Sequence, residues 1–352
     1  MKKITIIILV LSYKLCVCQV LLDANGQGNT YEEITQVLAP GYNPVEVPDC
    51  NHSIFGRHID EIFDTSLNVY VFRFILHTTP DNDRCLNFDR QRNEIKSYDK
   101  SPDNLLGIEN EIVEYKWKFK LDIGLQVSSN FTHIHQLKSV GGSLASMPMY
   151  TLTLRKSNPD RIELRYAETD TQITLKQTDL TPLKGVWIQA IETIKYGTNG
   201  TYKIVLKKVS DDTELFSYTN NSIINWRTGA DFVRPKWGIY RSLKNSSDLR
   251  DEEVLFANFS IEELSTLSNN NEQMFDDKIQ LFPNPSKNLV KIKEGISDSY
   301  TSLKIYNNLG QEVLHQKSNL KIIDISEFTL GVYQVIFQKN KKNIAIKKLV
   351  ID

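Results

Sequence analysis

The sequence predicts an all-β fold, a β-sandwich of the jelly-roll type followed by a second, small all-β domain. Three observations predict it. The chain carries 15 Tyr and 15 Phe, which recur with Val, Ile and Thr in short runs. About a dozen such runs alternate apolar and polar residues at regular spacing, with almost no helical periodicity. A polar stretch at 265–273 separates the runs into two groups.

The first group of runs extends from residue 69 to residue 261. The clearest run is 114–122, where Tyr115, Trp117, Phe119 and Leu121 would face a core and the lysines between them would face water. The other expected strands are 69–77, 90–96, 130–138, 149–155, 161–166, 172–176, 185–194, 202–209, 235–242 and 253–261, and one helix is expected at 31–38.

The second group of runs lies beyond the polar stretch and predicts a small all-β domain. Its strands are expected at 279–282, 289–292, 302–306, 311–314, 322–325, 332–337 and 344–351. The predicted organisation is therefore a first domain at 19–263, a linker at 264–276 and a second domain at 277–352.

The first 18 residues are typical of a secretory signal peptide. Lys2 and Lys3 form the charged region, and the apolar run 4–11 is too short to span a membrane. A cleavage site is expected before Gln19. A lipoprotein signal with Cys18 as the lipidated residue is an alternative that the neighbouring residues fit poorly.

Removal of this signal leaves Cys50 and Cys85. In an exported protein such a pair is expected to form a disulfide, although free thiols are the alternative. The bond would close a loop of about 35 residues, which stabilises a fold by roughly 3 kcal/mol in the chain-entropy model. The net charge of -1 gives no basic excess, so nucleic acid is not an expected partner.

The strand expected at 90–96 has an unusual charged face. Side chains on a strand alternate, so Arg90, Arg92, Glu94 and Lys96 would share one face. Such a face suits the floor of a cleft that binds an anionic polymer. The alternative is a solvated edge strand with salt bridges.

A pair of histidines lies in the strand expected at 130–138. Alternation would place His133 and His135 on one face and Ile134 in the core. Three interpretations remain open: two metal ligands that still need a third and a fourth, two structural histidines, or a catalytic histidine beside a substrate-binding neighbour.

The strand expected at 235–242 carries polar and small residues on one face. Lys236, Gly238 and Tyr240 would share that face. Because Gly238 has no side chain, a ligand could approach the strand between Lys236 and Tyr240.

Two other polar stretches could bind a metal. The stretch 50–64, which includes His52 and His58, could contact a metal or the cleft, or form a surface turn. A structural Ca²⁺ is the second possibility, and a solvated loop is its alternative. The oxygen ligands would come from an acidic turn formed by Asp248, Asp251 and Glu252.

The second domain resembles the C-terminal sorting domain of the Bacteroidetes type IX secretion system. The residues that carry the resemblance are 281–285 (LFPNP), 305–313 (IYNNLGQEV), 330–333 (LGVY) and 347–351 (KKLVI). The resemblance implies an immunoglobulin-like β-sandwich, contact with the type IX machinery, and a secreted or cell-surface protein. It implies nothing about chemistry.

Three stretches of the first domain together resemble the active-site signature of jelly-roll, concanavalin-like polysaccharide lyases related to alginate lyases. Those enzymes carry Arg-x-Glu-x-Arg, Gln-Ile-His and Lys-x-Gly-x-Tyr strands in this order. Here the stretches are 92–96 (RNEIK), 133–135 (HIH) and 236–240 (KWGIY). Lys96 replaces the second arginine and His133 replaces the glutamine, which favours a glucuronan or ulvan substrate over alginate.

The resemblance implies β-elimination from a uronate. Arg92 would neutralise the carboxylate, His135 would be the base and Tyr240 the acid, or Tyr240 would do both if the elimination is syn. No cofactor is required, the partner is an anionic polysaccharide, and the chain is expected to be a monomer. The implied substrate-binding residues are Arg90, Glu94, Lys96, His133, Gln136, Lys236 and Arg241.

Two other functions fit the same fold. A non-catalytic carbohydrate-binding sandwich would use the cations without an acid and a base. A retaining glycoside hydrolase would need two carboxylates about 5 Å apart, and the chain has no Glu-x-Asp-x-x-Glu strand to supply them. Glu94 would be a poor acid, because the cations beside it should lower its pKa.

Overall fold

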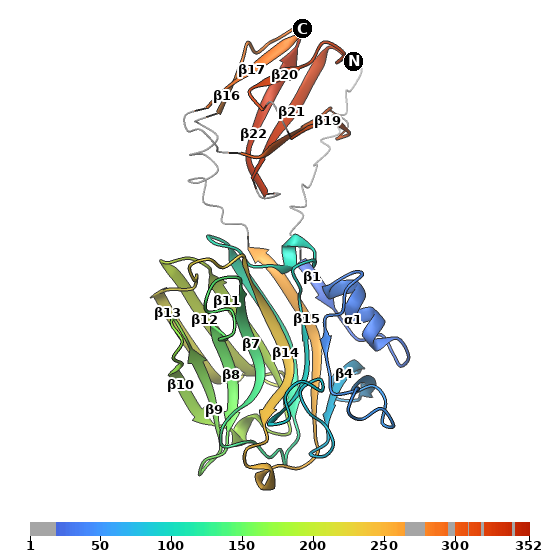
Figure 1. Cartoon of the computed structure of the whole chain (residues 1–352), viewed down its shortest axis with the longest axis vertical. Coiled ribbons are helices and arrows are strands. Elements are labelled where there is room, and N and C mark those ends of the chain that lie inside the picture. Colours follow the sequence, from blue (N-terminus) through green and yellow to red (C-terminus); the bar gives the residue numbers. More distant parts are fainter. Residues whose placement is uncertain (1–18, 265–278, 295–299, 309, 318–319, 340–341) are drawn as a thin grey trace, which may run out of the picture. The chain divides into compact units, whose positions relative to one another are not determined.

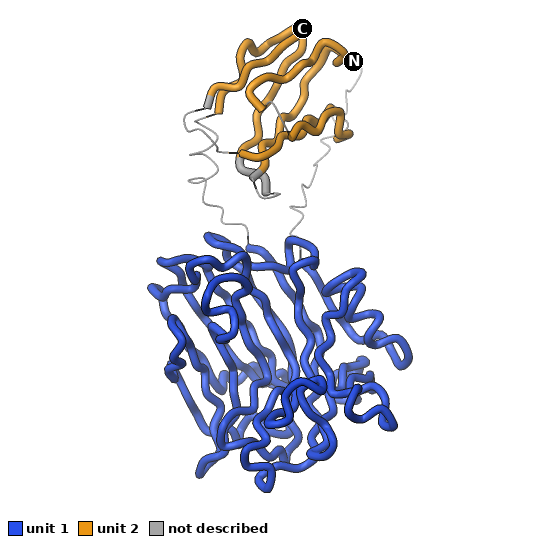
Figure 2. Tube along the Cα trace, in the orientation of Figure 1, with its two compact units in different colours: residues 1–265 blue, residues 266–352 orange. Residues whose placement is uncertain are grey.

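The computed structural model describes residues 19–264, 279–294, 300–308, 310–317, 320–339 and 342–352. The expected signal peptide and all but the first residue of the expected linker lie outside the described residues. The chain divides into two compact units, residues 1–265 and 266–352 (Figure 2).

The first unit is a sandwich of two antiparallel sheets (Figure 1). In the eight-stranded sheet β1 pairs with β15, and the other strands follow one path. That path is β13 (Glu214–Ile223), β12 (Gly200–Lys208), β11 (Trp187–Lys195), β6 (Ile112–Leu121), β15 (Glu252–Leu264), β4 (Val69–Leu76) and β3 (Ile59–Asp64), with β1 at Gln19–Leu22.

The seven-stranded sheet carries the three stretches that the sequence singled out, on the central strands β7, β14 and β5. Its order is β10 (Ile173–Asp179), β9 (Arg161–Tyr166), β8 (Tyr150–Arg155), β7 (Thr132–Val140), β14 (Phe232–Ser242), β5 (Arg90–Lys96) and β2 (Val45–Glu46). These strands come from distant parts of the chain and lie side by side.

The core lies between the two sheets. β6 alternates as predicted, with Trp117 and Phe119 fully buried, and the opposite sheet contributes Trp237 and Ile95. Helix α1 (Thr30–Leu38) forms where it was expected and buries Ile34. The sequence analysis missed β1, β2, β3 and β13, because two of them are very short, β3 was interpreted as a possible turn, and β13 is mostly polar.

The second unit forms two small antiparallel sheets, so the all-β prediction is confirmed for both units. Leu303, Val335 and Phe337 are fully buried in its core. One sheet is β16 (Ile279–Phe282), β17 (Leu289–Glu294) and β20 (Ile322–Asp324), and the other is β19 (Glu312–Gln316), β18 (Ser302–Tyr306), β21 (Gly331–Lys339) and β22 (Lys342–Ile351).

The predicted disulfide forms between Cys50 and Cys85, whose Cα atoms are 6.3 Å apart. It ties the segment before β3 to the segment that leads into β5. Among the described residues, no helix combines the length and the apolar character that a membrane crossing needs.

Candidate active site

Strand β5 separates its charged side chains from its other side chains, as alternation predicts. Ile95 is buried in the core between the sheets. Arg92, Glu94 and Lys96 bind charged groups on the opposite side, which we call the charged face of the seven-stranded sheet. The charged side chains of β5 are thus neither core residues nor simple solvated charges.

Glu46, from the two-residue strand β2, binds several of the cationic side chains on the charged face. It accepts hydrogen bonds from Nζ of Lys96 at 2.8 Å and from Nη1 of Arg84 at 2.7 Å. The Nζ of Lys236 donates to Glu46 as well and to Glu94 at 2.9 Å. The cations are therefore linked through carboxylates of the protein itself.

Glu94 is fully buried and accepts hydrogen bonds from two more donors, Nη1 of Arg92 and Nε2 of Gln136. Burial opposes ionisation of Glu46 and Glu94, but the charges of Lys236 and Arg92 hold the pKa of both carboxyls below the usual range. Both side chains are therefore ionised at neutral pH. Of the two cations that flank Glu94 on β5, Arg92 binds it, whereas Lys96 binds Glu46 instead.

Arg92 lies at the centre of this arrangement. Its Nε donates to Oδ1 of Asp83 at 2.9 Å, and its guanidinium lies 3.7 Å from the ring centroid of Tyr240. Burial lowers the pKa of Arg92, but Glu94, Glu46 and Asp83 outweigh burial and raise it. Arg92 is thus permanently charged, and its proposed contact with a uronate carboxylate stays a prediction.

Tyr240 reaches the charged face from β14 and is 9% exposed. Its Oη accepts a hydrogen bond from Nη1 of Arg90 at 3.0 Å. Its ring lies near the rings of His133 and Phe131, with centroids 5.8 Å and 5.1 Å away. Arg90, which the resemblance implies as a substrate-binding residue, therefore binds the oxygen of the predicted acid.

His133 and His135 do not share a face, so that prediction is wrong. The register shifts between them: His133 pairs with Thr153 of β8 and His135 with Leu152, which makes Ile134 an extra residue in β7. A bulge of one residue reverses the alternation that the sequence analysis assumed.

His135 points into the core, where its ring packs 4.4 Å from that of Trp117. Its Nε2 lies 2.8 Å from Oε2 of Glu192, a residue of β11 in the other sheet. Its Nδ1 lies 3.0 Å from the backbone oxygen of Lys236. His135 therefore cannot reach a substrate on the charged face and is a structural histidine.

His133 is the histidine that lies beside Tyr240. Burial lowers its pKa to about 3, so its imidazole is neutral at ordinary pH. Its Nδ1 is buried and finds no hydrogen-bond partner among the described residues. A buried nitrogen without a partner is costly unless another molecule supplies one, which makes His133 a candidate ligand-binding group.

Two further expectations need correction. Gly238 has φ +143°, and a Cβ at this position would lie 2.1 Å from the backbone oxygen of Asn93. The glycine is therefore required because β5 passes so close to it. The backbone of β5 fills the space that a ligand was expected to use. Arg241 is fully buried on the other side of β14, where its Nε donates to Oε1 of Gln91 at 2.7 Å. Arg241 is therefore removed from the substrate-binding set.

The sequence analysis missed three residues that contact the predicted ones. Glu46 gave no signal because a two-residue strand has no periodicity. Asp83 and Arg84 fell in or beside a turn and were given no role, although Arg84 Nε donates to Asp83 Oδ1 at 2.8 Å. The link between Asp83 and Arg92 could not be read from sequence.

The acidic turn that was considered as a possible Ca²⁺ site has its side chains bound to different partners. Asp248 accepts from Lys156, Asp251 accepts from the backbone nitrogen of Thr78 at 2.7 Å, and Glu252 binds Arg250. Each of the three carboxylates thus has its own partner, and they are not arranged around a common point where an ion would bind.

Comparison with known proteins assigns the second unit. Residues 280–352 match the family model described as the secretion system C-terminal sorting domain. Residues 280–352 are a sorting domain. The sorting domain marks the chain as secreted or displayed at the cell surface, as expected. No curated protein matches the chain in sequence.

The first unit has distant structural likenesses among solved proteins. An endo-β-1,4-glucuronan lyase from Trichoderma reesei is 12% identical with a TM-score of 0.45, covering 69% of this chain and 94% of that one. A PL-14 alginate lyase from Aplysia kurodai is 13% identical with a TM-score of 0.49, covering 69% and 98%. An alginate lyase from Pseudomonas aeruginosa is 12% identical with a TM-score of 0.41, covering 62% and 97%. At such identities, neither substrate nor catalytic residues carry over.

Proposed function

We propose that the protein is a secreted polysaccharide lyase that cleaves a uronic-acid-containing polysaccharide by β-elimination, with glucuronan or ulvan favoured over alginate. The observation that supports this most is the position of Tyr240. Its oxygen is bound by Arg90, and its ring contacts the guanidinium of Arg92 and lies near the neutral imidazole of His133.

β-Elimination removes the proton from C5 of a uronate, forms the C4–C5 double bond and expels the oxygen on C4. Tyr240 is proposed to act as a phenolate that has released its own proton to solvent: it takes the C5 proton and passes that proton to the leaving oxygen of C4, which regenerates the phenolate and makes the reaction a syn elimination. Arg90 donates to the oxygen that would carry negative charge once Tyr240 has given up its own proton. The position of His135 leaves Tyr240 as the better candidate for both steps.

The uronate carboxylate must be neutralised, because its charge opposes loss of the neighbouring proton. Within the described part of the chain Nδ1 of His133 has no hydrogen-bond partner, and Arg92 supplies a permanent positive charge. A donor placed where charge develops contributes roughly 3–4 kcal/mol in oxyanion-type sites. Lys96 and Lys236 already bind Glu46, so we propose that they shape the charged face and attract the polymer.

The direct test incubates the purified protein with glucuronan, ulvan, alginate and heparin and follows the ultraviolet absorbance of the new double bond. We expect a rise with glucuronan or ulvan that exceeds the rise with alginate. If absorbance stays flat with every uronate polymer, the lyase proposal fails.

One observation favours a second candidate, a binding module for anionic polysaccharide. The donors of Arg92, Lys96 and Lys236 are engaged by protein carboxylates, as suits a rigid recognition surface. Retardation of the protein in gels that contain ulvan, without any absorbance rise in solution, would select this function.

A pH dependence of polymer binding is expected from Lys138, a residue of β7 that pairs with Arg234 of β14. Burial and the charges of Lys236, Arg92 and Arg234 lower the pKa of Lys138 to about 8. The ammonium is therefore present below pH 8 and is lost above it, so affinity for an anionic polymer should fall about threefold to tenfold between pH 7 and pH 9.

Calorimetric titration in a Tyr240→Phe background, where the polymer is not expected to be cleaved, measures this affinity. Lys138→Gln should bind more weakly at pH 7 and lose the fall between pH 7 and pH 9. An unchanged pH profile in Lys138→Gln would assign the effect to another group.

A further inference from the structure

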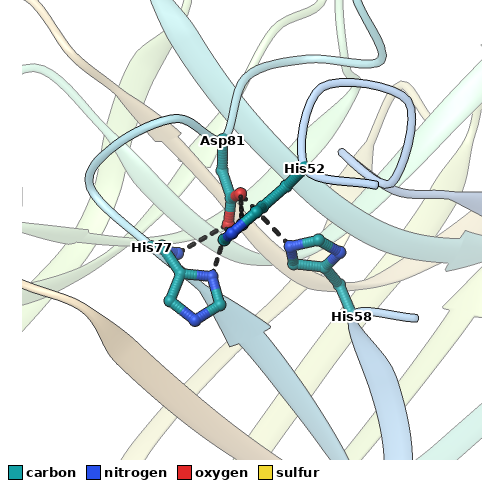
Figure 3. A group of neighbouring side chains, drawn as sticks. All are labelled: His52, His58, His77 and Asp81. Atoms are coloured by element: carbon teal, nitrogen blue, oxygen red, sulfur yellow. Dashed lines mark hydrogen bonds and ion pairs between the residues drawn. The ribbon is translucent and has the colours of Figure 1, made fainter. Parts of the chain in front are cut away.

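Behind β5, on the side away from the charged face, three histidines surround one aspartate (Figure 3). His52 lies between β2 and β3, His58 directly precedes β3, and His77 and Asp81 follow β4. One ligand atom from each residue lies within 4.8 Å of every other. We propose that these four side chains bind one zinc ion, or a divalent ion with the same ligand preference.

Each histidine has a ring nitrogen near an oxygen of Asp81, and the four ligand atoms lie within 4.8 Å of one another. Zinc–ligand bonds of about 2.0–2.1 Å separate neighbouring ligand atoms by about 3.3 Å in a tetrahedron. Oδ1 of Asp81 lies 2.9 Å from Nδ1 of His52 and 3.2 Å from Nε2 of His58, and Oδ2 lies 3.2 Å from Nδ1 of His77. Small rotations of His52 and His77, which are partly exposed, would bring the four ligand atoms to zinc-binding distances.

The orientation of His58 is the second observation that points to a metal. Its Nδ1 lies 2.7 Å from Oδ1 of Asp49, and Tyr31 Oη donates to Oδ2 of the same carboxylate at 2.9 Å. Because Asp49 holds the proton on Nδ1, Nε2, which lies 3.2 Å from Oδ1 of Asp81, is the nitrogen left to bind an ion. Metal-binding histidines characteristically donate their other nitrogen to a carboxylate in this way.

The donor set selects the class of metal. Three imidazoles and one carboxylate are nitrogen-rich, which suits zinc and neighbouring transition metals and does not suit Ca²⁺ or Mg²⁺, which prefer oxygen. Asp81 and His58 are buried, while His52 and His77 are about one-fifth exposed. The ring of Phe55 lies against His58 and His77, with centroids 4.8 Å and 4.3 Å away, and covers the cluster.

The site would support the strand that carries the charged face. Gln91 of β5 points backwards, and its Nε2 donates to the backbone oxygens of His77 and Asp81, the latter at 3.0 Å. Asp83, two residues beyond Asp81, binds Arg92. An ion held by four protein ligands and by no substrate would thus be structural, and its loss would loosen the support of β5.

The test uses untagged, full-length protein that has been stripped with a chelator and then titrated with ZnCl₂ in a calorimeter. We expect one zinc per chain, competition by Co²⁺ but not by Ca²⁺, and the visible absorption of four-coordinate cobalt. We also expect the melting temperature to rise by about 5–10 °C when zinc exceeds Kd 100-fold. No saturable zinc binding by the folded wild-type protein would overturn the proposal.

Single substitutions test whether zinc binds at the proposed four residues. His77→Ala, at a partly exposed position, should abolish stoichiometric binding, and Asp49→Asn should weaken the affinity about 10-fold to 100-fold. His315→Ala removes an exposed histidine of the sorting domain and should change nothing. Unchanged zinc affinity in His77→Ala would show that zinc binds elsewhere and would reject the site.

Discussion

Tyr240→Phe should lower kcat for a uronate polymer by roughly 10²-fold to 10⁴-fold, the contribution of a positioned acid or base. The change removes one oxygen and keeps the ring that lies near Arg92 and His133. Polymer affinity should stay within about twofold, because the cations of the charged face are unaltered. Initial rates of absorbance increase and calorimetric binding on the same preparation measure both quantities.

The matched control is Tyr70→Phe, which removes a tyrosine oxygen from β4 in the other sheet. It should leave the rate unchanged. A Tyr240→Phe protein that cleaves at the wild-type rate would remove Tyr240 from the reaction, and equal losses in kcat and affinity would make it a binding residue.

Glu46→Gln should lower the free energy of unfolding by about 3–5 kcal/mol, the effect of removing one partner from a buried ion pair. Glutamine keeps the shape of the side chain but leaves Lys96 and Lys236 without one of their carboxylates. Urea denaturation of both proteins at pH 7 measures the difference.

The difference in free energy of unfolding between wild type and Glu46→Gln should shrink as the pH falls. The pKa of Glu46 is held well below its unfolded value of about 4.3, so the stabilisation is fully present above that value. It is lost as the pH falls through the folded pKa, so wild type and Glu46→Gln should converge in acid. Glu32→Gln breaks an exposed pair with Arg57 and should barely change stability. Similar effects of the two substitutions would contradict a buried network at Glu46.

Alternation predicted much of the fold and part of the site. It placed the charged side chains of β5 on one face and the aromatic residues of β6 in the core, because both strands are regular along their length. The motifs 281–285 and 330–333 located the sorting domain, and the export context predicted the disulfide. These features depend on local pattern or on composition.

The errors have one physical origin. The bulge at Ile134 arises from the pairing of β7 with β8 and β14. Nothing in the sequence of residues 132–136 predicts it. The glycine at 238 looked like room for a ligand, although the space is filled by the backbone of β5. Glu46 enters the site from a strand of two residues. Such features arise from tertiary contacts, which a single sequence does not display.

The disulfide has a consequence for the denatured chain. The bond joins residues separated by 35 positions, and His52, His58, His77 and Asp81 all lie between them. In a denatured chain that keeps the disulfide, all four side chains lie in one covalent ring, which raises their concentration around one another. The pairing of β5 with β14 instead joins residues such as Glu94 and Lys236, 142 positions apart. The back of β5 can thus assemble by local closure, whereas its charged face requires a search over much of the chain.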